Sequence, residues 1–371
     1  MGHPRNAWVE VDLAAVSHNV RALDALTPAG TRFMAVVKAD GYGHGAVEVA
    51  GRALAAGAKR LGVATVDEAI EIREAGITAP LQMLSEAPAE AAEFLVHHDV
   101  IATVATREFA IALSRAAMRA EKQTAYHLKV DSGMNRIGVR AEEAGDAAAW
   151  LRDMPGLVFE GMFTHFATAD TPGDWEFGRL VERFASAIED VRSEWVRPPL
   201  VHSANSAATI LHPDTHLDMV RCGIALYGLH PSSATYDAID LKPAMSVKAR
   251  VTQVKRIGLG EGVSYGFTWH AGGPTTIATL PLGYADGVHR LLSNQMSVLI
   301  GGRRCRQVGR VCMDQFMVEV PDGNVRQGDE AVLVGKQGNA SITMDELAGL
   351  AGTINYELAC GFALRMARHH T

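Results

Sequence analysis

A lysine at the end of a short apolar run is the residue in this sequence best suited to chemistry. Residues 33–37 are apolar and partly β-branched, as in a strand that is buried on both faces. Lys38 follows directly, and glycines then occupy every second position, at Gly41, Gly43 and Gly45. A lysine amine at the end of a buried strand can be desolvated, lose its proton and form a Schiff base with a carbonyl carbon. The alternative is a solubilising charge, which is the usual role of a lysine at a strand end.

Apolar runs alternate with helical stretches through the first two-thirds of the chain. We expect strands at 33–37, 60–64, 80–84, 100–104, 125–130, 159–163, 200–201 and 219–226. Most are separated by Ala- and Glu-rich stretches with helical spacing, at 46–58, 66–74, 107–122, 142–152 and 175–194. Eight strands alternating with helices over about 200 residues predict an α/β fold, a (β/α)8 barrel of the TIM type.

Polar residues gather where the predicted strands end. They lie at 38–43, 129–136, 164–165, 202–206 and 221–224. In a barrel of this kind the chemistry takes place at the carboxyl ends of the strands. The sequence therefore places a candidate site at that face.

The pattern changes near residues 242 and 243. Residues 244–257 alternate as one long strand, and further β-type runs follow at 276–280, 297–300, 306–311, 316–320 and 330–334. One helix is expected near 343–351, where Thr343 and Glu346 suit a capping box. Residues 8–12 alternate like a short strand, and 13–26 read as an amphipathic helix. We therefore predict an N-terminal strand in 1–12, a barrel in 13–241 and a mostly-β C-terminal domain in 242–371.

Composition narrows the classes of function. The chain has 371 residues, of which 48% are hydrophobic and 21% charged, as in an ordinary globular protein. Its net charge of −7 gives no support for binding to nucleic acid or to anionic membranes. We find no signal-peptide core and no apolar run of about 18 residues, so no membrane span is expected. The 4 cysteines form no CxxC pair, which favours a cytoplasmic protein with no metal site.

Residues 35–45, Ala-Val-Val-Lys-Ala-Asp-Gly-Tyr-Gly-His-Gly, resemble the pyridoxal phosphate (PLP) signature of the alanine racemases. Eleven residues with ordered glycines are far more specific than a lone glycine-rich loop. The resemblance extends over the whole chain and implies that Lys38 carries the cofactor. It also implies that PLP phosphate is bound by Tyr42, Asn205, Ser206, Gly223, Ile224 and Tyr356.

In this resemblance Arg221 contacts the pyridine nitrogen of the cofactor. Because arginine does not give up its proton, it holds that nitrogen unprotonated, which weakens the electron sink and suits racemisation. The resemblance assigns proton transfer to Lys38 on one face of the substrate Cα and to Tyr265 on the other. A free tyrosine, with a pKa of about 10, is a poor base. The resemblance supplies His165 and Arg221 as a chain from Tyr265 to the ring.

The remaining implied residues concern the substrate. Arg136 matches the residue that meets the substrate carboxylate, which an arginine fork recognises well. Lys129 matches a position that is often carbamylated in the family, where it orients Arg136. Met313 and Asp314 match contacts on the carboxylate side. The positions of a narrow entrance that favours a small amino acid are matched by Asp170, Tyr284, Arg290, Arg310 and Ile354.

The resemblance implies a homodimer with shared active sites, because the second base comes from the partner subunit in that family. It also places the N-terminal strand in the β domain. The implied function is interconversion of L-alanine and D-alanine, which supplies D-alanine for peptidoglycan. Two departures from the family pattern, at Asn135 and at residues 365–368, bear on fine specificity more than on the type of reaction.

Three other functions share part of this pattern. A racemase of another small amino acid, such as serine, is left open by the sequence. A basic amino-acid decarboxylase with a similar fold would carry a Gly-Gly-Gly phosphate loop, which is absent here. A single-domain PLP-binding barrel without turnover would end near residue 240 and would lack Tyr265.

Overall fold

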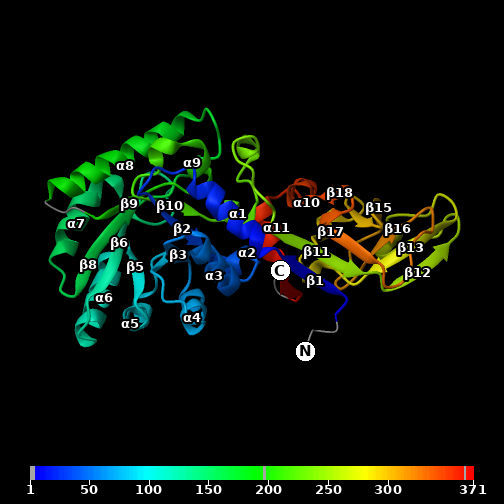
Figure 1. Ribbon diagram of the computed structural model, residues 1–371, viewed down its shortest axis with the longest axis horizontal. Coiled ribbons are helices and arrows are strands. Elements are labelled where there is room, and N and C mark those ends of the chain that lie inside the picture. Colours follow the sequence, from blue (N-terminus) through cyan, green and yellow to red (C-terminus); the bar gives the residue numbers. More distant parts are fainter. Residues whose placement is uncertain (1–4, 195–197, 363–364) are drawn as a thin grey trace. The chain divides into compact units, whose positions relative to one another are not determined.

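The computed structural model describes residues 5–194, 198–362 and 365–371, and the chain divides into two compact units (Figure 1). The barrel unit contains Ala15–Gly41 and Ala46–Lys242. The β unit contains Met1–Ala14, Tyr42–Gly45 and Pro243–Thr371. Among the described residues, no helix combines the length and the apolar character needed to cross a membrane.

The barrel unit is built on a parallel sheet of eight principal strands, which confirms the predicted (β/α)8 barrel. Neighbouring strands pair in the order β10-β2-β3-β4-β5-β6-β8-β9, and the short β7 (Val139–Arg140) pairs with β6. Backbone hydrogen bonds from Asp218 N to Val201 O, 3.0 Å, and from Arg221 N to Ala204 O, 3.0 Å, connect the two ends of this order. The principal strands are β2 (Arg32–Val36), β3 (Arg60–Val63), β4 (Leu81–Met83), β5 (Val100–Val104), β6 (Thr124–Asp131), β8 (Leu157–Phe163), β9 (Leu200–His202) and β10 (Met219–Cys222).

Helices lie outside these strands, as Figure 1 shows for α4 to α8. Their apolar stripes face the sheet while their other faces are exposed, which is the pattern of amphipathic helices. Thr65 and Glu68 form a complete capping box at the start of α4. The helices are α1 (Leu13–Asp24), α3 (Ala46–Ala56), α4 (Val66–Glu74), α5 (Ala92–His97), α6 (Arg107–Arg119), α7 (Ala144–Arg152), α8 (Trp175–Ser193) and α9 (Ser206–Leu211), with 3₁₀ turns at Ala89–Ala91, Ala141–Glu143, Pro213–Thr215 and Ser233–Thr235.

The eighth strand is shorter than the sequence predicts. We expected a strand over residues 219–226, but β10 ends at Cys222 and Ile224–Tyr227 form a 3₁₀ helix, η4. The turn is as apolar and as buried as the strand before it, so the hydrophobic pattern cannot distinguish them. The fully buried Tyr227 donates its hydroxyl hydrogen to Val36 O at 2.9 Å, which ties η4 to β2.

The β unit is a ten-stranded sheet with two helices, α10 (Met344–Ala351) and α11 (Asn355–Gly361). Its path is β12-β13-β16-β15-β14-β17-β11-β1-β19, with β18 paired to β17. The N-terminal strand β1 pairs antiparallel with β11 and parallel with β19. The strands are β1 (Ala7–Val11), β11 (Met245–Arg250), β12 (Gln253–Ile257), β13 (Thr275–Leu280), β14 (Ser297–Ile300), β15 (Arg303–Val308), β16 (Phe316–Glu319), β17 (Glu330–Gln337), β18 (Ala340–Ile342) and β19 (Ala367–His370), and the 3₁₀ turns are η6 (Tyr265–Phe267), η7 (Tyr284–Asp286) and η8 (Arg290–Leu292).

Two local predictions in the β unit need correction. Residues 244–257 form two strands, because the chain leaves β17 after Arg250 and pairs with β13 from Gln253 onward. The sequence marks this bend, because apolar residues alternate up to Val251, Thr252 and Gln253 are both polar, and Val254 resumes in the other phase. Thr343 caps α10 by accepting from Glu346 N at 3.0 Å. The Glu346 carboxylate, however, binds Arg304 at 2.5 Å, so the return bond of a capping box is replaced by an ion pair.

Candidate active site

Lys38 stands where β2 ends and begins a short left-handed turn, α2 (Lys38–Tyr42). Its side chain is half-buried. Three consecutive residues after it have positive φ angles: 51° at Ala39, 53° at Asp40 and 60° at Gly41. Left-handed conformation costs roughly 1–2 kcal/mol for each residue with a Cβ. Strain of this kind is concentrated at functional sites, where surrounding contacts hold it in place.

Two carboxylates hold this turn. Glu68 accepts from Ala39 N at 2.7 Å and from Ala64 N at 2.7 Å, which joins the segments that follow β2 and β3. Asp40 accepts from Ala46 N at 3.0 Å, so it supports the first residue of α3. The glycine-rich sequence indicated a turn here, but it did not reveal its hand or the role of Glu68.

Arg221 lies in β10 and is 4% exposed. Its Nη2 donates to Thr164 O and to Ser203 O, each at 2.9 Å, and lies 3.4 Å from His165 Nδ1. Its Nη1 donates to His202 Nδ1 at 3.0 Å. A guanidinium has five N–H groups. The second N–H of Nη1 and the N–H of Nε therefore have no acceptor among the described residues.

The charge of Arg221 is held without a carboxylate. Among the described residues no acidic side chain lies within ion-pair distance of it, and its recorded acceptors are neutral. Burial lowers the pKa of Arg221 to about 9, so it remains charged at neutral pH. The Phe163 ring lies beneath the guanidinium carbon, 5.4 Å from the ring centre. A buried cation with spare donors fits a neutral acceptor such as a ring nitrogen.

The predicted phosphate-binding residues of the barrel unit meet beside Arg221. Asn205 caps α9, its side-chain oxygen accepting from Ala208 N at 3.0 Å. Ser206 Oγ accepts from Gly223 N at 2.9 Å, so its hydroxyl hydrogen is available to a further acceptor. Ile224 follows as the first residue of η4. The backbone N–H groups at the starts of α9 and η4, together with the Ser206 hydroxyl, form a set of hydrogen-bond donors suited to an anion.

Lys129 is a buried amine on β6. Its Nζ lies 4.4 Å from the centre of the Phe163 ring. Burial, followed by the charges of Arg221 and Arg136, lowers the pKa of Lys129 well below 10.5, while Asp131 opposes the shift. The neutral amine is therefore favoured, and a neutral amine is a nucleophile.

Arg136 is exposed on the loop that follows β6. Asp131 shapes this loop by accepting from Gly133 N at 2.9 Å and from Asn135 N at 3.1 Å. Asn135 has a φ of 55°, which asparagine adopts more readily than most residues.

His165 and Asp170 follow β8. Burial first, and then the charges of Arg221, Lys129, Arg136 and Lys38, lower the pKa of His165 well below 6.5. The imidazole is therefore neutral. Asp170 is half-buried, and its backbone oxygen accepts from Ser232 Oγ at 2.8 Å.

In the β unit, Tyr265 begins the 3₁₀ turn η6 and is 71% exposed. Ser264 precedes it with a φ of 66°, and its hydroxyl donates to Arg310 O at 2.7 Å. Gly309 is needed here, because a Cβ would come 2.5 Å from Val263 O. The structure therefore brings Tyr265 and Arg310 together on adjacent loops.

The other predicted residues of the β unit form two pairs and three separate positions. The Tyr42 and Tyr356 rings are 6.3 Å apart. Tyr284 N donates to Cys312 O at 3.0 Å, which places it beside Met313. The remaining positions are Arg290, which begins η8, Ile354, which is 60% exposed at the start of α11, and Asp314, whose carboxylate binds Arg365 at 2.7 Å.

Sequence reasoning placed His202 among the polar residues at the strand ends but assigned no role to it, to His127 or to Glu160. His202 contacts Arg221 directly, and His127 and Glu160 continue the same hydrogen-bonded group. The available signal was in the run 125–130, where His127 and Lys129 alternate with apolar residues. Strand side chains with a period of two share a face. A polar face on a barrel strand was therefore visible in the sequence.

Fold and site together define a class of protein, an enzyme built on a (β/α)8 barrel followed by a β domain. The family described as "Alanine racemase, N-terminal domain" matches residues 11–231, and "Alanine racemase, C-terminal domain" matches residues 244–370. The chain belongs to the alanine racemase family of isomerases.

Individual relatives agree along the full length. The chain is 47% identical to an alanine racemase of Symbiobacterium thermophilum, covering 99% of this chain and 97% of the relative. It is 45% identical to an alanine racemase of Desulfovibrio desulfuricans, covering 98% of each. Among solved structures, alanine racemase from Bacillus anthracis with bound L-Ala-P has a TM-score of 0.95 and 38% identity, covering 100% of this chain and 96% of that one. Alanine racemase from Streptomyces lavendulae has a TM-score of 0.96 and 35% identity, covering 100% and 98%.

Proposed function

We propose that this protein interconverts L-alanine and D-alanine with pyridoxal phosphate as its cofactor. Arg221 is the observation that carries the proposal. It is a buried cation without a carboxylate among the described residues, with two N–H groups left for a neutral acceptor. Such a group binds a pyridine nitrogen and keeps it unprotonated, as a racemase requires.

The donor set of the barrel unit fits this cofactor. Lys38 would hold its aldehyde carbon, and Arg221 would donate to its ring nitrogen. Asn205, Ser206, Gly223 and Ile224 would bind its phosphate, together with the hydroxyls of Tyr42 and Tyr356. When bound, PLP withdraws electrons from the substrate Cα–H bond and makes that proton removable.

Two side chains of this protein would move the proton. Lys38 Nζ removes it from, or returns it to, one face of the substrate Cα, and Tyr265 Oη acts on the opposite face. The neutral His165 lies 3.4 Å from Arg221 Nη2, where it can accept a hydrogen bond without adding a charge. With one such group on each face of Cα, one would remove the proton from its face and the other would supply its own proton to the opposite face, which inverts Cα.

The substrate carboxylate would be bound by Arg136, with contacts from Met313 and Asp314. Lys129 is suited to carbamylation, in which its neutral amine adds to carbon dioxide and loses one proton. The resulting anion would orient Arg136. It would also balance the positive charge of Arg221 beside the Phe163 ring. An entrance that admits a small amino acid would be formed by Asp170, Tyr284, Arg290, Arg310 and Ile354.

We infer a homodimer with shared active sites, in which Tyr265 of each chain serves the partner. Large apolar side chains are exposed on the same loops as Tyr265, including Phe267 at 61% and Leu259 at 75%. Exposed apolar groups of this size favour burial in an interface. We also propose a cytoplasmic enzyme that supplies D-alanine for peptidoglycan. Free thiols at Cys222, Cys305 and Cys312 suit a reducing compartment.

The test is a substrate panel. Purified protein with PLP is incubated separately with L-alanine, L-serine, L-lysine and L-arginine, and the enantiomers are then resolved and any released amine is measured. We expect D-alanine to form much faster than the other D-amino acids, with no amine. Faster formation of D-serine would favour the alternative racemase. Cofactor binding without any D-amino acid would contradict the proposal.

A further inference from the structure

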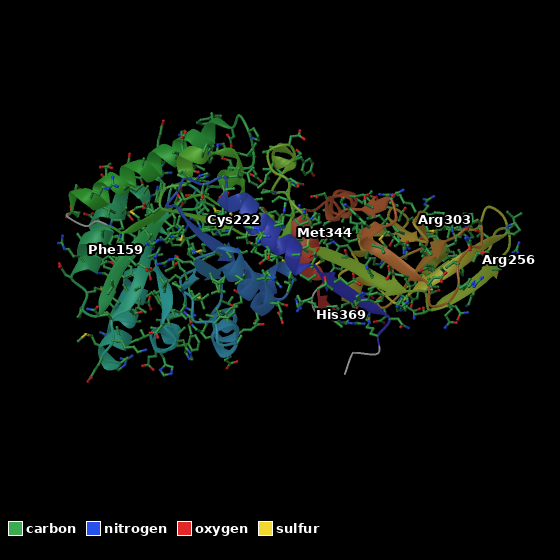
Figure 2. The ribbon with its side chains drawn as sticks, viewed as in Figure 1. Phe159, Cys222, Arg256, Arg303, Met344 and His369 are labelled. Carbon is green, nitrogen blue, oxygen red and sulfur yellow. The ribbon has the colours of Figure 1, made fainter. Side chains whose placement is uncertain are left out.

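The interior of the barrel contains a hydrogen-bonded chain that ends on Arg221. The interior of a (β/α)8 barrel is normally filled by layers of branched apolar side chains. Here His127 and His202 are fully buried, Arg60 is 5% exposed and Arg221 is 4% exposed. Glu160 completes the group from β8. Figure 2 labels Phe159 and Cys222, which are the chain neighbours of Glu160 and Arg221 on β8 and β10.

Arg60 and Glu160 form one end of the chain. Arg60 donates to both carboxylate oxygens of Glu160, at 2.9 and 2.5 Å. Burial would raise the pKa of Glu160, but hydrogen bonds from His127 and Arg60 outweigh it and lower the pKa to about 2. Glu160 is therefore a carboxylate at neutral pH and can only accept hydrogen bonds.

The direction of every hydrogen bond follows from this end. Because Glu160 only accepts, His127 must carry its proton on Nε2, which lies 3.0 Å from the carboxylate. Burial lowers the pKa of His127, so the ring is neutral and its Nδ1 has a lone pair. His202 Nε2 lies 2.7 Å from that lone pair and must donate to it. His202, whose pKa burial also lowers, therefore presents a bare Nδ1 to Arg221 at 3.0 Å.

The other end of the chain requires the same arrangement. Arginine can only donate, so it needs a lone pair on His202 Nδ1. Starting from Glu160 or from Arg221 gives identical tautomers for both histidines. The Phe163 ring stacks on His202 with an interplanar angle of 1°, which fixes the imidazole plane. Gly161 leaves room for His127, because a Cβ would lie 2.6 Å from its Cε1.

We propose that Glu160, His127 and His202 are positioning residues that hold Arg221 in place through a single fixed set of tautomers. None of them is among the residues proposed above to contact the substrate. They present one neutral acceptor to Nη1, and the other N–H of Nη1 and that of Nε have no acceptor among the described residues. A fixed Arg221 should suppress loss of the substrate amino group to the cofactor. This consequence rests on the proposed function, whereas the hydrogen-bonded chain itself does not.

Glu160→Gln leaves at least one N–H of Arg60 without an acceptor whichever way the amide lies. If its oxygen faces His127, its NH₂ group faces the Arg60 donor. If its NH₂ group faces His127, both histidines must reverse, and an N–H of His202 then meets an N–H of Arg221. Glu86→Gln is the matched control. Glu86 also accepts from three donors of the same unit, at 2.5, 2.8 and 2.7 Å. It belongs neither to the hydrogen-bonded chain that ends on Arg221 nor to the candidate site.

The first measurement needs no cofactor. Nitrogen NMR of ring-labelled histidines in the cofactor-free protein should show His127 and His202 as neutral Nε2–H tautomers with bare Nδ1 atoms, assigned with His127→Gln and His202→Gln. An Nδ1–H tautomer or an imidazolium at His202 would overturn the proposal, and it would do so even if Glu160→Gln does not fold.

The second measurement uses the loaded enzyme. We expect Glu160→Gln to raise the ratio of amino-group loss to racemisation about tenfold, equivalent to about 1.4 kcal/mol. We expect Glu86→Gln to leave this ratio unchanged. An unchanged ratio in Glu160→Gln, or an equal rise in Glu86→Gln, would contradict a positioning role. If the unmodified protein forms no D-alanine, the proposed function is refuted instead. The NMR measurement of the histidine tautomers would still test the hydrogen-bonded chain in that case.

Discussion

Replacement of Arg221 by lysine keeps the positive charge but removes some of the hydrogen bonds that position it. The guanidinium donates to two backbone carbonyl oxygens at 2.9 Å through Nη2 and to His202 Nδ1 at 3.0 Å through Nη1. A single ammonium nitrogen cannot occupy both positions, so Arg221→Lys keeps the charge but loses one or two of these bonds. A bond from a charged donor contributes roughly 1.5–3 kcal/mol, and an orphaned buried carbonyl costs about 1–3 kcal/mol. We therefore expect the free energy of unfolding to fall by about 3 kcal/mol.

Arg73 provides a matched control in the same unit. It lies in α4, and its guanidinium donates to four backbone carbonyl oxygens at 2.7–3.0 Å. Arg73→Lys should therefore destabilise the protein by a similar amount without touching the candidate site. Urea unfolding gives the stability of both variants, and the visible absorption of bound PLP reports on the ring nitrogen.

The two variants should differ in activity. We expect Arg221→Lys to lower kcat about tenfold to a hundredfold, or about 1.4–2.7 kcal/mol, and to shift the cofactor spectrum. Arg73→Lys should retain the activity and spectrum of the unmodified protein under conditions where both are folded. A stability of Arg221→Lys within about 0.5 kcal/mol of the parent would refute the hydrogen-bond argument. Equal loss of activity in Arg73→Lys would show that general destabilisation explains the effect.

Three further predictions concern the dimer, the buried carboxylate and the second domain. Lys38→Ala and Tyr265→Phe should each be almost inactive, but random mixed dimers should recover about a quarter of parental activity, because half of them carry one intact site; a mixture no more active than its parts would contradict shared sites. The folded pKa of Glu160, about 2, lies below its ordinary value of 4.5, so its stabilisation is present above pH 4.5 and is lost as pH falls towards 2. Relative to Glu160→Gln we expect about 2 kcal/mol of this stabilisation, after allowance for screening, and a difference in unfolding free energy that persists at pH 2 would refute it. Gly283→Ala should lower kcat and cost about 1–3 kcal/mol, because a Cβ would lie 2.2 Å from Met313 O; unchanged thermal unfolding and kcat would contradict this reading.

The parts of the fold that follow a repeating pattern were predictable. The barrel strands are short apolar runs separated by amphipathic helices, and period and spacing suffice to order them. The β11–β12 bend was missed although the sequence marks it, because Thr252 and Gln253 interrupt the alternation between Val251 and Val254. The turn at Ile224–Tyr227 was missed because burial demands the same apolar residues from a strand and from a 3₁₀ turn.

The candidate site was predictable only in its individual residue types. Lys38 and Arg221 could be proposed from their neighbours in the sequence. The hydrogen-bonded chain from Glu160 to Arg221 could not be proposed from the sequence. Its members come from β8, β6, β9 and β10, and the sequence does not show which residues of these strands lie side by side. The left-handed turn after Lys38 was equally hidden, because it includes Ala39 and Asp40, which ordinarily avoid that conformation.

The most direct test of the central claim follows alanine from both sides of its equilibrium. Purified protein with PLP is supplied with L-alanine in one reaction and with D-alanine in another, and the enantiomers are resolved over time. Both reactions should converge on an equal mixture, at rates that fall to background in Lys38→Ala. If either enantiomer persists unchanged while PLP is bound, the protein is not a racemase of alanine and the assignment of Lys38 and Tyr265 is wrong.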